Sequence, residues 1–298
     1  MGMAGRPAGY GVEQLLASPR FRVAISHLAE NFVAQYLSAP RIAAPFATQQ
    51  RWLLCQAVLA RHFRPSADGK GGLTRAGFAH AALQSGIASR NTAYAFFDEA
   101  LKYGILRSQD ESGALVPSPG ALSLLCLWYD AHLCALDLID GAQRSTCFQA
   151  DPQACLPRLA PSVADGLLAN RAVRAPGPLY TIFTWADSGG LLMDRLIAGI
   201  DWQILPAHGG HITDVTSISD LARSFGLSRA HASRKLAAAE SIGALGWSGR
   251  RGHSRIWISA DFYAEYATAQ AQKLSIIDTA FSALRADDPS SGRGFRPV

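Results

Sequence analysis

The chain has 298 residues, of which 49% are hydrophobic and 17% charged, and its net charge is +5. This composition predicts that most of the chain folds, into one large or two medium domains. The longest apolar run, residues 121–129, is too short to cross a bilayer, and residues 1–14 lack the pattern of a signal peptide. We therefore expect a cytoplasmic protein without a membrane partner.

The positive charge is concentrated in two segments. Residues 219–258 hold seven Lys and Arg against two Asp and Glu, a net +5, and residues 1–64 hold seven Arg against two Glu, again +5. Residues 118–218 hold five Arg against nine Asp, a net −4. Clustered charge of one sign indicates a polyanionic partner.

Helical spacing of apolar residues predicts helices over residues 12–37, with a break at Pro19, and over residues 45–63. From residue 74, a pattern of five elements occurs twice: a short helix, a longer helix closed by Gly, two short strands and a trailing helix. The first copy is predicted at 74–86, 88–104, 105–108, 115–118 and 119–141. The second is predicted at 217–226, 228–243, 244–247, 255–259 and 260–286, preceded by a helix at 188–205.

The two copies match most closely at the longer helix. When Ser89 is placed on Ser228, Phe97 falls on Leu236 and Gly104 on Gly243. One extra residue in the turn of the first copy is all that the alignment needs. This agreement predicts an internal duplication.

The order of these elements is typical of a winged helix-turn-helix. The segment "SISDLARSFGLSRAHASRKLAAAESIGAL", residues 217–245, resembles the DNA-binding region of bacterial winged-helix transcription regulators of the MarR and GntR groups. The first copy resembles it more weakly. Ala239 and the sequence Gly243-Ala244-Leu245 depart from the usual family pattern, which leaves the subfamily open.

The resemblance implies a mainly α fold with small β-hairpin wings. We expect two winged helix-turn-helix units joined by a helical core, to which the trailing helices and the N-terminal helix contribute, so that one chain is a pseudo-dimer. The expected segments are a flexible N-terminus 1–11, a helical segment 12–44, a first unit 45–141, a connector 142–187, a second unit 188–286 and a flexible tail 287–298.

The second copy carries the candidate DNA-binding residues. Ala232, Leu236, Ala239 and Gly243 share one face of the helix 228–243, which leaves a small, basic face outward. Such a face fits a major groove, where Arg recognises guanine, and an Arg-rich hairpin tip fits the DNA backbone or a minor groove. The predicted contacts are Ser228 as N-cap, Arg229, His231, Ser233, Arg234 and Lys235 on the helix, and Arg250, Arg251, His253 and Arg255 in the wing 247–257.

The first copy differs where DNA would be contacted. Ala95 and Phe96 replace Arg234 and Lys235, and its hairpin tip, residues 109–113, contains two acids that phosphate would repel. Two interpretations stay open: a weaker DNA contact, or a helix-turn-helix retained for packing. The residues available for a weaker contact are Ser89, Arg90, Asn91, Thr92 and Tyr94.

No catalytic motif is recognisable. The pair His208 and His211 lies in a Gly-rich loop without a third ligand, the five cysteines form no CxxC pair, and residues 68–72 lack the spacing of a phosphate-binding loop. We expect neither an enzyme nor a cofactor nor a bound metal. Trp128, Tyr129, Trp185 and Trp202 either line an effector pocket or belong to the core.

These expectations favour a sequence-specific transcription regulator whose partner is double-stranded DNA, acting as a monomeric pseudo-dimer or a homodimer. A small-molecule effector is left open. Two other functions share the predicted fold: a tandem winged-helix replication initiator of plasmid type, which would bind repeated origin sequences, and a protein-interaction scaffold in chromosome segregation, for which a basic wing is unnecessary.

Overall fold

A computed structural model describes residues 9–38, 48–64, 73–108, 115–184, 189–204 and 209–286 of the chain. The structure is mainly helical, at 72%, with one antiparallel sheet of two strands and one of three. The predicted mainly α fold with small β-hairpins is therefore present. The expected flexible tail at residues 287–298, and the tip of the first hairpin at residues 109–113, lie outside the described residues.

The N-terminal segment forms two helices, α1 (Val12–Ala17) and α2 (Phe21–Ser38). The helix breaks before Pro19, as predicted, since proline lacks the N–H donor that would continue it. One face of α2 is buried, including Ile25 and Leu28. Residues 39–44, which we expected to extend this segment, are not among the described residues.

The first unit contains four helices and a two-stranded sheet. In chain order, its elements are α4 (Gln49–Phe63), α5 (Arg75–Gln84), α6 (Arg90–Lys102), β1 (Leu106–Ser108), β2 (Leu115–Pro117) and α7 (Pro119–Asp140). β1 and β2 are antiparallel, and an isolated bridge joins Leu73 to Leu115 of β2.

The second unit contains four helices and a three-stranded sheet. Its elements are α12 (Gly189–Ala198), β3 (Gly210–Ile212), α13 (Ile218–Ser224), α14 (Arg229–Ser241), β4 (Leu245–Trp247), β5 (Ile256–Ser259) and α15 (Ala260–Ala286). The central strand is β5, which pairs with both β3 and β4. Two details differ from expectation: α12 ends at Ala198 rather than near residue 205, and β3 was not predicted.

The two units share hydrogen bonds at equivalent positions. In both units a Ser caps the N-terminus of the longer helix. The turns before and after this helix are closed by backbone hydrogen bonds to equivalent carbonyls, and the residue at the end of the hairpin donates to the residue just before its first strand. The equivalent pairs are Leu73 N to Leu115 O and Thr213 N to Ile256 O; Ile87 N to Ala82 O and Leu227 N to Ala222 O; Thr92 N to Ser89 Oγ and His231 N to Ser228 Oγ; Ile105 N to Ala100 O and Ala244 N to Ala239 O; Ser118 N to Ile105 O and Ser259 N to Ala244 O.

The connector is largely helical, which the sequence had not resolved. Its helices are α8 (Arg144–Ala150), α9 (Pro152–Ala169), α10 (Arg171–Arg174) and α11 (Pro178–Thr184). α9 packs against α4 and α15, so the connector supplies part of the core that we expected from the trailing helices.

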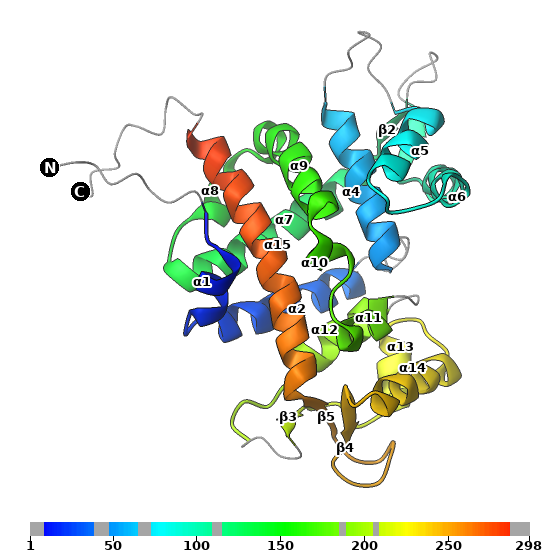
Figure 1. Cartoon of the computed structure of the whole chain (residues 1–298), viewed down its shortest axis with the longest axis vertical. Helices are drawn as coiled ribbons and strands as arrows, with labels where there is room; N and C mark the ends of the chain where they lie inside the picture. Colours follow the sequence, from blue (N-terminus) through cyan, green and yellow to red (C-terminus); the bar gives the residue numbers. More distant parts are fainter. Residues whose placement is uncertain are drawn as a thin grey trace, which may run out of the picture.

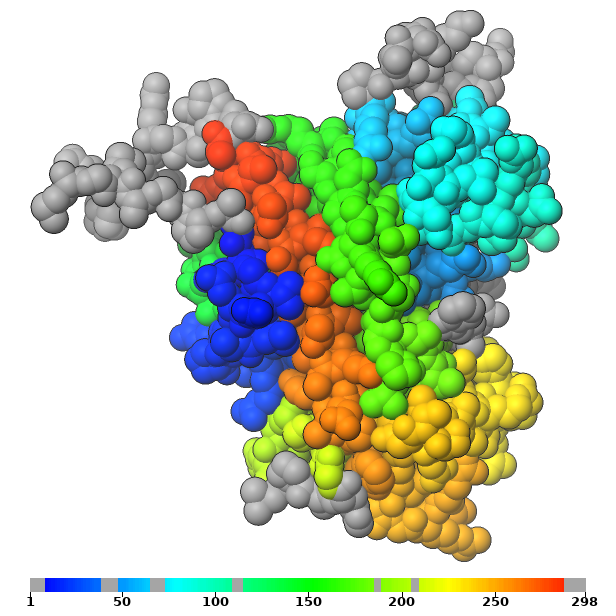
Figure 2. All heavy atoms as spheres, in the orientation of Figure 1, coloured from blue at the N-terminus to red at the C-terminus, as the bar shows by residue number. Residues whose placement is uncertain are grey.

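The helical core joins the two units, which lie toward opposite ends of the long axis (Figure 1). α15 runs along the core beside α9 and contacts α7. α1 packs against the C-terminal half of α15. α2 packs against α7 and α12, and thereby links one helix of each unit. On the face shown in Figure 2, residues of α9 to α11 separate the surfaces of the two units.

One described helix, α7, is long and apolar enough to cross a membrane. Nine of its residues, including Tyr129, Leu133 and Leu136, are buried, and α7 packs against α2, α8 and α15. A core helix of this kind is consistent with a soluble protein.

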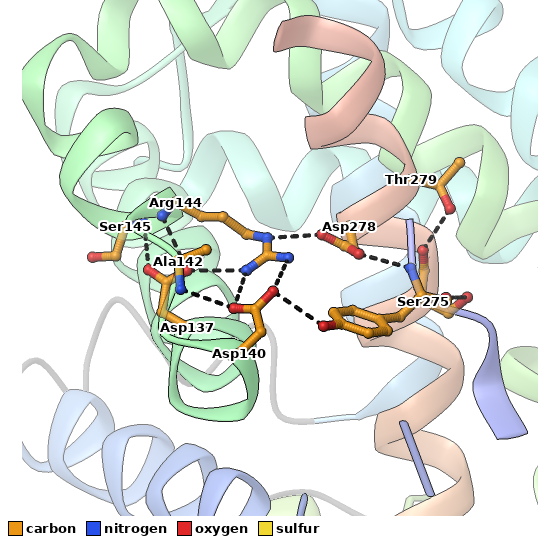
Figure 3. A network of polar contacts seen from close by, with 9 residues as sticks. Asp137, Asp140, Ala142, Arg144, Ser145, Ser275, Asp278 and Thr279 are labelled. Atoms are coloured by element: carbon orange, nitrogen blue, oxygen red, sulfur yellow. Dashed lines mark hydrogen bonds and ion pairs between the residues drawn. The ribbon is translucent and has the colours of Figure 1, made fainter. Parts of the chain in front are cut away.

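A buried polar cluster ties the C-terminal end of α7 to the C-terminal half of α15 (Figure 3). The guanidinium of Arg144 lies 2.8 Å from a carboxylate oxygen of both Asp140 and Asp278, and 3.2 Å from Asp137. The backbone N–H of Tyr10 donates to the other oxygen of Asp278, which is only 2% exposed. Burial by itself would raise the pKa of the Asp140 carboxyl, but its hydrogen bonds from Arg144 and Ala142 hold that pKa below the usual value.

We predict that Arg144→Met lowers the free energy of unfolding by about 3–5 kcal/mol, because it leaves the buried carboxylate of Asp278 without its cation. Urea unfolding followed by circular dichroism measures the change. The control is Arg20→Met at an exposed site, which should change stability by no more than about 0.5 kcal/mol. Equal effects of the two substitutions would contradict a structural role for the cluster.

His132 of α7 gives a second test, based on pH. Its Nδ1 lies 2.7 Å from the Trp128 carbonyl, and burial lowers its pKa to about 3. The unfolded chain, with a His pKa of about 6.5, binds a proton below that pH while the folded chain does not. This group should therefore cost about 2 kcal/mol of stability between pH 7 and pH 5.

We predict that His132→Leu removes this part of the pH dependence, measured as the free energy of unfolding in urea from pH 7 to pH 5. The exposed His80→Leu is the control for loss of an imidazole. An unchanged slope in His132→Leu would rule out a neutral buried His132.

Candidate functional site

The candidate surface is built on α13, α14 and the hairpin β4–β5. Ser217 and Ser228 cap α13 and α14 by accepting hydrogen bonds from Asp220 N and His231 N. Gly226 makes the turn between the helices at φ +65°, a conformation that favours glycine. Ala232, Leu236 and Ala239 are fully buried, so the opposite side of α14 faces outward, as the sequence predicted. Gly243, which we expected on the same buried face, is exposed, because α14 ends at Ser241 and Gly243 turns the chain at φ +76°.

Two arginines dominate the outward side of α14. Arg229 and Arg234 are exposed and form no ion pair within the described chain, while Ser233 beside them is half-buried. The helix carries only Ala at positions 230, 237 and 238, so its outward face has little bulk. A helix with this face can approach a broad groove closely and place two guanidinium groups in it.

His231 and Lys235 lie differently from the other candidates. The Nε2 atom of His231 is buried and has no hydrogen-bond partner among the described residues. The ammonium of Lys235 donates to the carbonyl of Ile182 at 3.0 Å, and burial lowers its pKa. Ile182 belongs to the last turn of α11, whose carbonyls have no partner within the helix. Lys235 therefore stabilises the end of α11 rather than lying free on the outer face.

The hairpin β4–β5 carries the remaining candidates on its tip. Arg250 and His253 are exposed, and His253 N donates to Arg250 O at 3.0 Å to close the turn. Arg251 pairs with Glu240 of α14 at 3.0 Å, and Arg255 lies 3.4 Å from Asp201. These pairs are partly exposed, so each holds its side chain only weakly and a stronger anion could replace the carboxylate.

The first unit presents a different surface on α6. Ser89 caps the helix and Arg90 and Asn91 are exposed, but Thr92 is half-buried and lies 2.9 Å from the Ser89 hydroxyl. Tyr94 lies under the guanidinium of Arg75, 4.1 Å from its ring centre. Of the five weaker candidates, Arg90 and Asn91 therefore have the side chains that are most accessible to a partner.

The acids of α6 are already paired within the first unit. Arg75 bonds to both oxygens of Asp98, at 2.9 and 2.6 Å, and Arg51 bonds to Glu99 at 2.6 Å. In α14, Ala237 and Ala238 occupy the positions of these acids in the sequence alignment. The two helices thus share a backbone but differ in the charge that they offer to a polyanion.

The described residues contain no group of three His, Cys, Asp or Glu side chains that could hold a metal ion. His208 lies outside the described residues, and His211 packs against the rings of Trp202 and Tyr263. The chemistry on α14 and the hairpin is thus that of hydrogen-bond donors and positive charges, which suits anion binding.

We predict different effects for two neighbouring substitutions on α14. Lys235→Met should cost about 1 kcal/mol of stability, because the Ile182 carbonyl loses its donor. Arg234→Met, at an exposed position one residue earlier, should change stability by no more than about 0.5 kcal/mol. Urea unfolding measures both, and a free Lys235 side chain would instead make the two variants alike.

No protein-family model matches the chain, and no significant match was found among curated proteins or solved structures. The geometry and charge of the surface on α14 and the hairpin are therefore the basis for inferring what the chain binds.

Proposed function

We propose that this chain is a sequence-specific DNA-binding transcription regulator, cytoplasmic and built from two winged helix-turn-helix units. In both units a first helix, two further helices, a hairpin and a trailing helix follow in this order, and the second unit adds the strand β3 before its two helices; this order supports the assignment. In the second unit, α14 is the recognition helix and the hairpin β4–β5 is the wing.

The observation that carries the proposal is a pair of exposed arginines that form no ion pair with any described residue, on a helix with little other bulk. Arg229 and Arg234 are five residues apart and exposed. A guanidinium donates two parallel hydrogen bonds to O6 and N7 of guanine, the commonest specific contact in the major groove. The capped N-terminus of α14 also offers backbone N–H groups to a phosphate.

The wing supplies the contacts that do not depend on sequence. Arg250 and His253 are exposed at the tip, and Arg251 and Arg255 can exchange their exposed carboxylate partners for phosphate. Lys235 takes no part, since its ammonium is bonded to Ile182.

The packing of α7 against α15 supports a pseudo-dimer. Dimeric regulators commonly place two recognition helices in successive major grooves, about 34–36 Å apart. Here the trailing helices of both units belong to one chain and contact each other. We therefore expect one chain to bind one asymmetric site, with the second unit as the main reader.

We predict that Arg229→Ala/Arg234→Ala relaxes sequence specificity by about 1–3 kcal/mol for each lost base contact, while Arg250→Ala/Arg251→Ala mainly reduces the salt dependence of binding. The measurement is selection of genomic fragments, followed by titration of the selected site at several salt concentrations. Arg90→Ala/Asn91→Ala, which changes the two exposed candidates of the first unit, is the comparison variant and should have a smaller effect.

Each outcome of this experiment separates the proposal from its alternatives. No selected sequence, or no effect of either pair in the second unit, would refute DNA reading and favour a protein-interaction scaffold. Selection of a cluster of repeated sequences from a replication origin would favour a replication initiator. An equal effect in the first unit would show that both units read DNA.

A further inference from the structure

A groove of about 740 Å³ lies between the first unit and the connector. One side is formed by α4, α6 and the turn at Gly86, and the other by residues 174–184, from the end of α10 to the end of α11. A helix with its side chains is about 10–12 Å wide and rises about 5.4 Å per turn, so the groove offers the space of about one to two turns. It therefore suits a short helical segment of a protein.

The second unit shows which kind of element covers the equivalent position. There α11 packs against α14, and Lys235 of α14 donates to the carbonyl of Ile182. Phe96 takes the position of Lys235 in α6, but on this side the groove lies between the helix and α11. α11 itself lies between α6 and α14 (Figure 1) and has the apolar sequence PLYTIFT. A short apolar helix is thus what the chain itself places against a helix of this kind.

The side of α6 that borders the groove is apolar where α14 is basic. Ala95 is exposed in the groove at the position of Arg234, and Phe96, whose ring lies 6.0 Å from that of Phe78, stands at the position of Lys235. Glu99 also lines the groove, but its carboxylate is paired with Arg51 at 2.6 Å. This side of α6 therefore favours apolar contact over contact with phosphate.

A guanidinium at the groove has no carboxylate partner. Arg174 is exposed, donates to the carbonyl of Ser85 at 3.1 Å and forms no ion pair with any described carboxylate. Among the described residues that line the groove, the charges are Arg51, Arg174 and Glu99, a net +1. Charge complementarity thus favours a partner that carries a carboxylate near Arg174.

We propose that this groove binds a short amphipathic helix of another protein, with apolar side chains against Ala95 and Phe96 and a carboxylate against Arg174. The first unit then recruits a protein, while the basic surface of the second unit remains free for its own partner. This role explains why the first unit keeps the frame of a helix-turn-helix without its charge. The proposal does not depend on DNA binding by the second unit.

A displayed library of random peptides of about 16 residues is the probe, selected on the full chain without DNA. We expect the enriched peptides to share apolar residues at positions i, i+3 or i+4 and i+7, together with at least one Asp or Glu. The affinity of the most enriched peptide is then measured by fluorescence anisotropy.

The same substitution at equivalent positions of the two units gives a matched comparison. Ala95→Glu places bulk and negative charge in the groove and should weaken peptide binding at least about 10-fold. Arg234→Glu, at the equivalent position of α14, should leave the affinity for the peptide unchanged. Arg174→Ala should weaken binding about 5-fold for the acidic peptide but not for the same peptide with Gln in place of its acid.

Several results would overturn the proposal. Absence of a shared pattern among the selected peptides, or equal losses in Ala95→Glu and Arg234→Glu, would refute a docking site in the groove. Dimers in analytical ultracentrifugation that Ala95→Glu dissociates would assign the groove to a second copy of the chain. Enrichment of peptides only after Ile42→Ser/Phe46→Ser would assign it to apolar residues of the chain itself.

Circular dichroism checks that each variant is folded. If Ala95→Glu unfolds, Ala95→Gln serves as a second variant that adds bulk without charge, and it should weaken peptide binding at least about 3-fold. Unchanged binding in a folded Ala95→Gln and in Arg174→Ala would refute the proposal.

Discussion

The ion cluster around Arg144 is the interaction on which the arrangement of the two units depends. The carboxylates of Asp137 and Asp140 close the trailing helix of the first unit, and Asp278 lies on that of the second. A single guanidinium contacts all three carboxylates, in a place where water reaches little of Asp278. Buried charge of this kind adds little net stability but penalises every other packing of the helices. It therefore fixes how α7 meets α15.

The sequence predicted those parts of the fold that local rules determine. Ser89 and Ser228 mark helix starts and Gly104 and Gly243 mark helix ends, because capping and positive φ are local requirements. It left the connector unresolved and missed β3, because packing overrides local preference there. α9 contains Pro157 and Pro161, yet burial of Leu159 and Val163 keeps it helical. The three residues of β3 form a strand only because β5 pairs with them.

The candidate surface could be located from charge, but not resolved residue by residue. The exposure of Arg229 and Arg234 was predicted because apolar residues at helical spacing define the buried face of a helix and leave the other positions in contact with solvent. The hydrogen bond from Lys235 to the carbonyl of Ile182 joins residues 53 positions apart, so no local sequence pattern predicts it. Of the aromatic residues that we placed either in a pocket or in the core, Trp128 lines a cavity between α2, α4, α7 and α12 and Tyr129 is fully buried, while Trp185 lies outside the described residues.

The contact between the two ends of the chain has a consequence for how the protein is made. Tyr10 bonds through its N–H to Asp278 and through its carbonyl to Ser275, across more than 260 residues. Contacts of such high order form late, and a ribosome needs many seconds to add the intervening residues. Until α15 emerges, α1 and the apolar sides of α7 and α9 lack part of their cover. The nascent first half is thus the form most exposed to aggregation and most dependent on chaperones.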